Sequence, residues 1–120
     1  MPEIASNISV FAEYEVSEIM KKAKRALKHP GLDVLCHPAQ TLDFGRILVV
    51  TSRKVGPAVK RNLIRRRLKA IFYENKLYEQ KWDYICIIKK PGINLTFDQL
   101  KDILIQVSCK VAEVIKNSQK

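Results

Sequence analysis

The chain has 120 residues, which is the usual size of one domain and too few for two independent cores. Its 22 Lys and Arg residues against 12 Asp and Glu residues give a formal net charge of +10, which favours a polyanionic partner such as RNA, DNA or an anionic membrane. Hydrophobic residues make up 47% of the chain, so the excess charge is expected on a folded surface and not in a disordered tail.

The cysteines and the apolar runs indicate the compartment. Cys36, Cys86 and Cys109 are an odd number without close pairing, which argues against a disulfide framework and for a reducing environment. The start of the chain lacks the pattern of an export signal, and the apolar runs at Ile47 to Val50 and Tyr84 to Ile88 are too short to span a bilayer. We therefore expect a cytoplasmic protein with no membrane partner.

The first part of the chain predicts an arm followed by a helix. Residues 1–13 show no clear period and are expected to form a loosely ordered arm, with a single domain over residues 14–117. From Tyr14 onward, apolar residues recur at the spacing of an amphipathic helix as far as Leu27. His29-Pro30-Gly31 then ends this predicted helix.

The middle of the chain predicts two strands and a second helix. Leu32 to Cys36 and Arg46 to Thr51 are rich in residues that favour strands. Gly56-Pro57 breaks the second strand, and Pro57 is well placed near a helix start. Residues 58–76 contain good helix formers with no internal Gly or Pro, which predicts the second helix.

The last part predicts a buried strand and a third helix. Trp82 to Ile88 is an apolar run, closed by the turn Lys89-Lys90-Pro91-Gly92. Thr96 and Gln99 have the spacing of a capping box, and an apolar stripe runs from Phe97 to Val114. The predicted order αββαβα contains one strand–helix–strand crossover. It predicts an α/β fold of the α+β type, a two-layer sandwich of a small sheet with helices.

A cluster of basic residues lies at the start of the second predicted helix. Between residues 53 and 69 there are eight basic residues and no acidic one: Arg53, Lys54, Lys60, Arg61, Arg65, Arg66, Arg67 and Lys69. At about 100° per residue, Arg61, Arg65 and Lys69 form one row with Asn62 and Arg66 beside it. Like charges at this spacing destabilise an isolated helix by roughly 0.2–0.5 kcal/mol per pair, so the row predicts an external anion. On charge pattern alone, a solvated face and a membrane-surface or calmodulin-type helix remain alternatives.

The sequence shows no set of residues for catalysis by the protein. His29, Cys36 and His37 are the only candidates near one another, and Cys36-His37 lacks the second ligand pair of a zinc site. The carboxylates show no paired spacing of a Mg²⁺-dependent nuclease. We predict no catalytic residue and no metal ligand. Trp82 and Cys86 are interpreted as core residues, although tryptophan also stacks on bases in RNA-binding proteins.

Three stretches resemble the ribonuclease P protein family. The segment from Val50 to Lys69 is similar, without a gap, to the family signature V-S-K-K-x-G-x-A-V-x-R-N-R-x-K-R-x-x-R-E. The segment from Asp83 to Gly92 resembles the family's strand with its basic-Pro-Gly turn, and the segment from Leu95 to Leu100 resembles the start of its last helix. The resemblance covers about residues 46–111, over half of the chain.

The resemblance implies a protein component of ribonuclease P. Such a protein binds the catalytic RNA and the 5' leader of precursor tRNA, and it assists removal of the leader. It also implies that the active site and its Mg²⁺ ions belong to the RNA subunit, with no cofactor held by the protein alone. By analogy, the expected RNA-binding residues are Arg46, Arg53, Lys54, Lys60, Arg61, Asn62, Arg65, Arg66, Arg67 and Lys69. The oligomeric state is not predicted.

The chain departs from the family at several places: Leu63 replaces the second Arg of the central motif, Lys69 replaces an Arg, Ala70 a Glu and Leu48 a Gly, and Val16 and Met20 replace aromatic residues of the leader cleft. Two interpretations of Leu63 stay open. Either Arg67 supplies the lost charge, or Leu63 is a core residue that faces the last helix.

Two other functions compete with this reading. The main alternative is a ribosomal or general RNA-binding protein without a role in cleavage, and a DNA-binding helix module is more distant. A helix-turn-helix would place another helix directly before the basic one, where this sequence predicts a strand and a Gly-Pro break.

Overall fold

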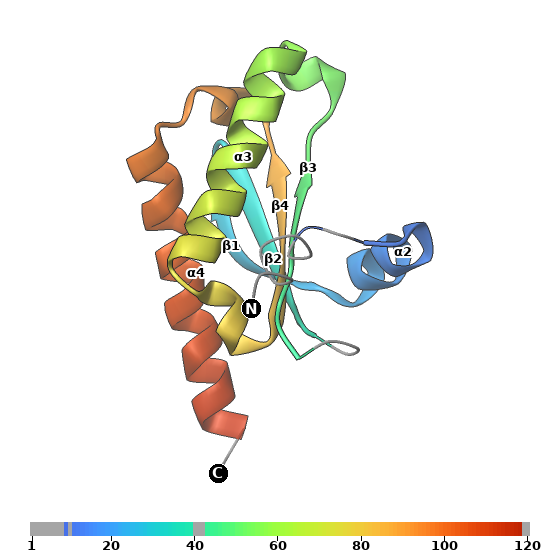
Figure 1. The fold of residues 1–120 in the computed structure, drawn as a ribbon, viewed down its shortest axis with the longest axis vertical. Helices are drawn as coiled ribbons and strands as arrows, with labels where there is room; N and C mark the ends of the chain where they lie inside the picture. Colours follow the sequence, from blue (N-terminus) through green and yellow to red (C-terminus); the bar gives the residue numbers. More distant parts are fainter. Residues whose placement is uncertain (1–8, 10, 40–42, 119–120) are drawn as a thin grey trace.

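A computed structural model describes residues 9, 11–39 and 43–118 of the chain. It contains one four-stranded sheet with α3 and α4 on one face and α2 across the other (Figure 1). In chain order the elements are α2 Glu13–Lys22, β1 Lys24–His29, β2 Leu32–Pro38, β3 Ile47–Val50, α3 Ala58–Glu74, β4 Trp82–Ile88 and α4 Phe97–Ser118. Three short 3₁₀ turns join them: η1 Arg53–Val55, η2 Leu77–Gln80 and η3 Lys90–Asn94.

The sheet has the order β1-β2-β4-β3. β2 pairs antiparallel with both β1 and β4, and β3 pairs parallel with β4, with Ile47 opposite Tyr84. Parallel neighbours need a crossover connection, and α3 supplies it between β3 and β4. The predicted α+β class and the single strand–helix–strand crossover are therefore confirmed.

The first predicted helix was too long. α2 ends at Lys22, and the segment expected to continue it as far as Leu27 is strand β1, so the order is αβββαβα. Ala23 and Leu27 fit the helical period, but Pro30-Gly31 forms a tight turn that lets β1 fold back on β2. In this hairpin Leu27 lies opposite Val34, which is fully buried. Pairing with β2 also packs Ala26 and Leu27, both partly buried, against the core, and such tertiary packing outweighs local helix propensity.

The hairpin turn packs tightly against η3. A Cβ atom added at Gly31 would lie 2.6 Å from the Cα of Gly92, and one added at Gly92 would lie 1.9 Å from the carbonyl oxygen of Gly31. Because no side chain fits in this gap, both positions require glycine. The Pro91-Gly92 turn that was predicted to end β4 thus also packs against the turn between β1 and β2.

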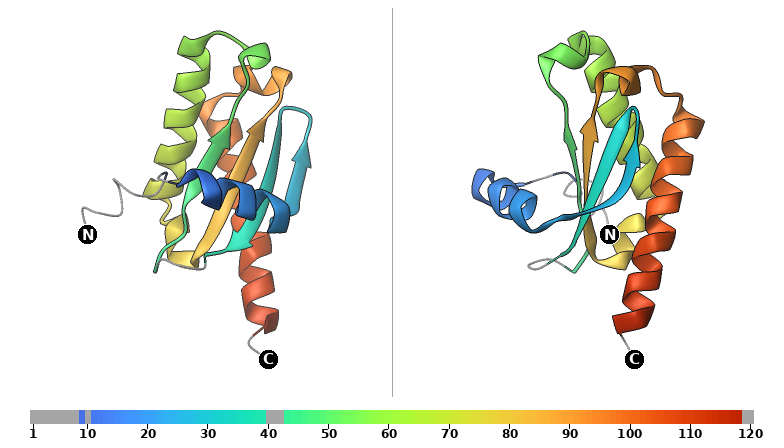
Figure 2. Two further views of the ribbon diagram at one scale, coloured as in Figure 1. Left: turned by 90° about the vertical axis from the view of Figure 1, so that its right-hand side faces the viewer. Right: turned by 180° about the vertical axis from the view of Figure 1, so that it is seen from behind.

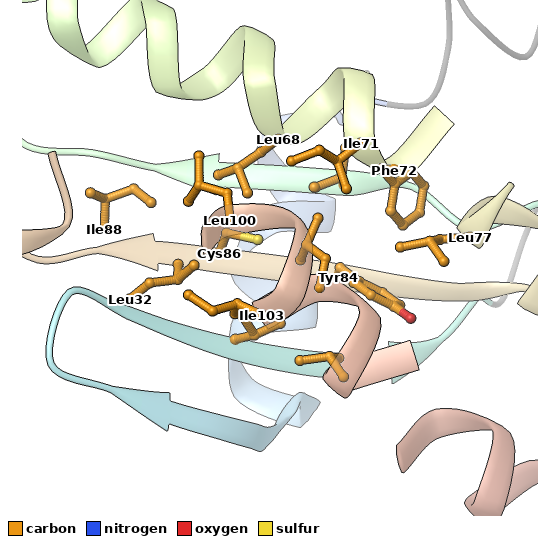
Figure 3. Packing of buried hydrophobic residues seen from close by; sticks show 14 of the residues in the cluster. Leu32, Leu68, Ile71, Phe72, Leu77, Tyr84, Cys86, Ile88, Leu100 and Ile103 are labelled. Carbon is orange, nitrogen blue, oxygen red and sulfur yellow. The ribbon is translucent and has the colours of Figure 1, made fainter. Parts of the chain in front are cut away.

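The core lies between the sheet and the pair α3 and α4 (Figure 3). Tyr84 of β4 is fully buried, contacts the ring of Phe72 at 5.1 Å between centroids, and donates a hydrogen bond from its hydroxyl to Gln80 Oε1 at 2.6 Å. Burying a large apolar side chain of this kind stabilises a fold by about 1.5–3 kcal/mol. Cys86 is also fully buried, as predicted, and burial raises the pKa of its thiol.

Several predicted boundaries are confirmed. β4 covers Trp82–Ile88 as predicted, and α3 begins at Ala58, directly after Pro57. The capping box is present, because the Thr96 hydroxyl accepts from the Gln99 N–H at 3.2 Å and Gln99 Oε1 accepts from the Thr96 N–H at 2.9 Å. Most of the predicted arm, residues 1–8 and 10, lies outside the described residues. α2 begins at Glu13, one residue before the expected start.

Candidate nucleic-acid interface

α3 is buried along one side and carries six basic residues outside its buried side. Ile64, Leu68, Ile71 and Phe72 are all buried, as the helical wheel predicted. These four residues fix the rotation of the helix on the sheet. We call the basic residues of η1 and α3, together with Asn62, the α3 cationic surface; its members are Arg53, Lys54, Lys60, Arg61, Asn62, Arg65, Arg66, Arg67 and Lys69.

Two arginines of this surface are held in place by the segment that precedes the helix. Arg61 Nε donates to the carbonyl oxygen of Gly56 at 3.1 Å. Arg65 donates from Nη2 to the Thr51 hydroxyl at 2.7 Å and from Nη1 to Asn62 Oδ1 at 3.2 Å. These acceptors are neutral, so they orient the guanidinium groups without neutralising their charge. Orientation reduces the entropy that an arginine loses when it binds a phosphate.

The role of Thr51 was missed in the sequence, although it lies inside the segment that resembles the family signature. It directly follows β3, and Arg65 is 14 residues further along the chain. The parallel crossover brings the end of β3 beside the first turns of α3, which is a tertiary effect. The sequence did contain one signal for this contact: Thr51 is a hydroxyl residue at the end of a predicted strand, shortly before the basic helix.

One flank of α3 forms a hollow against β3. Arg65, Arg66 and Lys69 line it together with Leu48, and its volume is about 270 Å³. Arg65 and Lys69 of the predicted row, together with Arg66 beside it, therefore border one recess next to the sheet, whereas Arg61 is not among its lining residues. Leu48, which replaces a glycine of the family pattern, contributes an apolar wall to this recess.

The other flank forms a second hollow against η3 and the start of α4. Lys60, Leu63 and Arg67 line this hollow of about 280 Å³, and Arg67 Nη1 donates to the carbonyl oxygen of Leu95 at 3.5 Å. Leu63 is half-buried and lies outside the buried core cluster. It faces the same recess as Arg67 and the first residues of α4. Compensation of the lost Arg by Arg67 thus has the required proximity, and it stays a prediction.

The cations of the α3 cationic surface form no ion pair with the acidic residues that the structure describes. Arg53, Lys54, Lys60 and Arg66 are exposed. The ion pairs among the described residues involve Lys22, Lys89 and Arg46 as cations, and none involves a residue of the α3 cationic surface. The positive charge is consequently uncompensated within the described part of the chain. Such a stripe raises the local concentration of polyanions.

Arg46 does not belong to this surface, although it was among the expected RNA-binding residues. It is only 5% exposed, and its Nη2 lies 2.8 Å from Glu15 Oε2 and 3.6 Å from Asp83 Oδ2. The ring of Phe11 stacks on the guanidinium at 4.1 Å, and the main-chain N–H donates to Asp83 Oδ1 at 2.9 Å. Arg46 therefore connects α2 and Phe11 to the sheet, and its expected RNA contact stays a prediction.

The two carboxylates around Arg46 have opposite pKa shifts. The hydrogen bond from Arg46 lowers the pKa of Glu15 below its ordinary value of 4.5. Burial raises the pKa of Asp83, and the attraction of Arg46 offsets this only in part. The difference follows from exposure, because the side chain of Glu15 is 22% exposed and that of Asp83 only 2%.

The described residues offer no metal centre and no membrane span. Among them no group of three or more His, Cys, Asp or Glu side chains is placed to hold a metal ion. None of the helices over the described ranges is long and apolar enough to cross a bilayer. The helix α3 is preceded by β3 and the three-residue turn η1, so the arrangement of a helix-turn-helix is absent at this point of the described chain.

Comparisons with known proteins agree with the fold and the surface. A family model described as ribonuclease P matches residues 11–112. The ribonuclease P protein component of Halalkalibacterium halodurans is 35% identical over 80 residues, which span 66% of this chain and 66% of that protein. The corresponding protein of Onion yellows phytoplasma is 31% identical over 107 residues, which span 88% of this chain and 74% of that protein.

Solved structures show the same architecture. The RNase P protein of Staphylococcus aureus superimposes with a TM-score of 0.73 at 26% identity, over 89% of this chain and 96% of that one. The RNase P protein of Thermotoga maritima gives a TM-score of 0.70 at 24% identity, over 82% and 93%, which supports the fold. Because the family model covers most of the sequence, including the whole α3 cationic surface, the chain belongs to the ribonuclease P protein family.

Proposed function

We propose that this chain is the protein subunit of a bacterial ribonuclease P, which binds a catalytic RNA and assists removal of the 5' leader from precursor tRNA. The observation that carries the proposal is the α3 cationic surface. It presents eight basic side chains without an internal acidic partner among the described residues, two of them on the turn η1 and six on α3, which four buried residues hold on the sheet. No observation favours a general RNA-binding protein over a member of the matched family.

Binding to the catalytic RNA is the first role. Neighbours along the α3 row are about 6 Å apart, so adjacent side chains reach successive phosphates of one strand. Arg61 and Arg65 are oriented by Gly56 and Thr51 and retain N–H groups for forked contacts to phosphate. Each phosphate contact releases a counterion, so binding is expected to weaken steeply with salt.

The chemistry of cleavage is assigned to the RNA subunit, whose bound Mg²⁺ ions would supply the activated water. This chain would lower the repulsion between two polyanions, the catalytic RNA and the precursor tRNA. Its cations would thereby reduce the Mg²⁺ concentration that the complex requires. The free thiols of Cys36, Cys86 and Cys109 fit a reducing cytoplasm, where this RNA processing would occur.

The 5' leader would lie on the face of the sheet that carries α2. On this face Val50 pairs with Ile87 in the β3–β4 register, and both are half-buried, so apolar surface remains accessible beside α2. Tyr14 of α2 is 75% exposed and provides an aromatic ring near this face. It would take the place of the aromatic residues that Val16 and Met20 replace.

Reconstitution tests the proposal. The purified protein is mixed with precursor tRNA alone, and with a bacterial ribonuclease P RNA at a Mg²⁺ concentration too low for the RNA by itself. We expect no cleavage without the RNA and restored cleavage with it. Cleavage by the RNA-free protein would contradict the assignment, and so would the absence of any stimulation with several bacterial ribonuclease P RNAs.

A further inference from the structure

A second basic recess lies at the opposite edge of the sheet from α3. α3 stands beside β3, whereas β1 forms the other edge, and the C-terminal half of α4 runs behind β1 and extends past the sheet (Figure 2). Between these elements is a hollow of about 630 Å³. We call it the β1–α4 groove; the lining residues that matter here are Lys22, Lys24, Arg25, Lys110, Trp82 and Val114.

The charged side chains that line the groove are all positive. Four of its lining residues are cations and none is acidic. Lys22 lies 3.8 Å from Glu18, so its charge is partly compensated, but Lys24 and Arg25 form no ion pair within the described part of the chain. Lys110 donates one hydrogen bond to the carbonyl oxygen of Ala26 at 2.8 Å, which holds its ammonium over the β1 edge. A lysine ammonium has three donors, so two remain for an anion.

The wall of the groove is apolar and contains the one tryptophan of the chain. Trp82 was expected in the core, but it is only half-buried and packs at the margin of the core cluster. Val114, the last residue of the predicted apolar stripe of α4, is 50% exposed beside it. An indole and an aliphatic side chain beside several cations suit a ligand that joins a flat ring to a separate anionic group.

We propose that the β1–α4 groove is a second RNA-binding site, which takes an unpaired nucleotide with its base on Trp82 and its phosphates on Lys24, Arg25 and Lys110. The volume lies within the range of about 300–1,000 Å³ that is usual for small-ligand sites. Base stacking on an aromatic ring beside a basic groove is how proteins bind single strands without reading their sequence. The base of a continuous duplex stays stacked on its neighbours and does not enter such a recess.

The charge excludes a second copy of this chain as the natural occupant. β1 is an edge strand, and edges of this kind pair with other strands when they are uncharged. Here Lys24, Arg25 and Lys28 follow the edge and would meet the same three cations of another copy. An RNA strand supplies the opposite charge. The proposed function supplies only one premise here, that the polyanion is RNA. The β1–α4 groove and the α3 cationic surface lie at opposite edges of the sheet.

Fluorescence of Trp82 tests the proposal directly, because no other tryptophan is present. The full chain is titrated with pentauridylate, and the emission of Trp82 is recorded. An abasic phosphodiester chain of equal length and polyglutamate serve as competitors. We expect saturable quenching by pentauridylate and binding of the abasic chain weaker by about tenfold. Equal binding of the abasic chain or of polyglutamate would overturn the proposal, and so would the absence of quenching.

Matched variants locate the site. Lys24→Gln/Arg25→Gln removes two groove cations, and Lys76→Gln/Lys101→Gln removes two exposed cations from elsewhere. We expect the first pair to weaken pentauridylate binding about tenfold and to lower its salt slope by about 1.4, and the second pair to change neither. Equal effects of both pairs would overturn the proposal. The variant Arg61→Ala/Arg65→Ala should bind the catalytic RNA more weakly but still show quenching of Trp82 by pentauridylate. The two sites can therefore be tested independently. Loss of the quenching in this variant would show that the oligonucleotide binds at α3.

Discussion

Arg46 and the arginines of α3 carry the same charge in two opposite environments. Arg46 is 5% exposed and lies between Glu15 and Asp83, with Phe11 stacked on its guanidinium. Arg61 and Arg65 are half-buried, and the oxygens that accept their hydrogen bonds are neutral. The first arginine is neutralised inside the fold, and the others present an oriented and uncompensated charge. Among the expected RNA-binding residues, the charge of a cation's partner therefore distinguishes a structural environment from one that is suited to binding.

The largest effect is expected at Arg46. Arg46→Ala leaves the buried carboxylate of Asp83 without its cation, and removing one partner of a buried pair costs about 3–5 kcal/mol in the free energy of unfolding. Urea denaturation measures this loss, with Arg66→Ala, an exposed arginine, as the control that should change stability by less than about 0.5 kcal/mol. Equal free energies of unfolding for the two variants would contradict the claim that the buried Arg46 stabilises the fold more than the exposed Arg66 does.

The next effect concerns RNA binding. Arg65→Ala and Arg61→Ala should each weaken binding to the catalytic RNA by about 1–3 kcal/mol if the contact is forked. The melting temperature should change little, because neither side chain lies in the buried core of α3. Fluorescence anisotropy with a labelled ribonuclease P RNA at physiological salt gives the dissociation constants. Unchanged dissociation constants for both variants would show that these two arginines of α3 do not contact the catalytic RNA.

The pH dependence of the free energy of unfolding tests the ion pair between Glu15 and Arg46. The pKa of Glu15 is lowered in the folded state, so its contribution is fully present above its ordinary value of 4.5 and is lost as the pH falls through the lowered value. We expect Glu15→Gln to be less stable than the parent chain by about 1 kcal/mol near neutral pH, with a smaller difference as the acid range is entered. The raised pKa of Asp83 acts in the opposite direction and is common to both chains. A difference that is independent of pH would contradict the ion pair.

The smallest effect is expected at Leu63. Leu63→Arg should strengthen binding to the catalytic RNA slightly and steepen its salt dependence by about one counterion. Arg67→Ala should weaken binding, and the double variant should recover part of the loss, because both residues line one recess. A melting temperature lowered by many degrees with an unchanged salt slope would show instead that Leu63 packs the recess for stability.

Local signals predicted much of the fold. Trp82 to Ile88 ends at a basic-Pro-Gly turn, and α3 begins after Gly56-Pro57, so these boundaries follow from residues next to them. The far end of α3 was placed two residues late, at Lys76, which adopts a left-handed conformation with φ of 54°. β1 was missed because its partner strand decides its structure, while its apolar spacing also fits a helix.

The candidate site was predictable where it depends on one helix. The helical wheel alone places Arg61, Arg65 and Lys69 on one row. The structural partners of Arg46 were not predicted, because Glu15 and Asp83 are 31 and 37 residues away in the sequence and only the folded chain brings them to it. The β1–α4 groove was overlooked for the same reason, since its residues come from α2, three strands and α4.

The central claim is that the unpaired cations of α3 bind RNA through its phosphates. The most direct test is the salt dependence of the dissociation constant for the catalytic RNA, measured for the parent chain, for Arg65→Ala/Arg66→Ala and for the control Lys76→Ala/Lys101→Ala. We predict that the slope of log Kd against log salt falls by about 1.4–1.8 in the α3 variant, which corresponds to two lost phosphate contacts, and stays constant in the control. The same slope for all three chains would contradict the account.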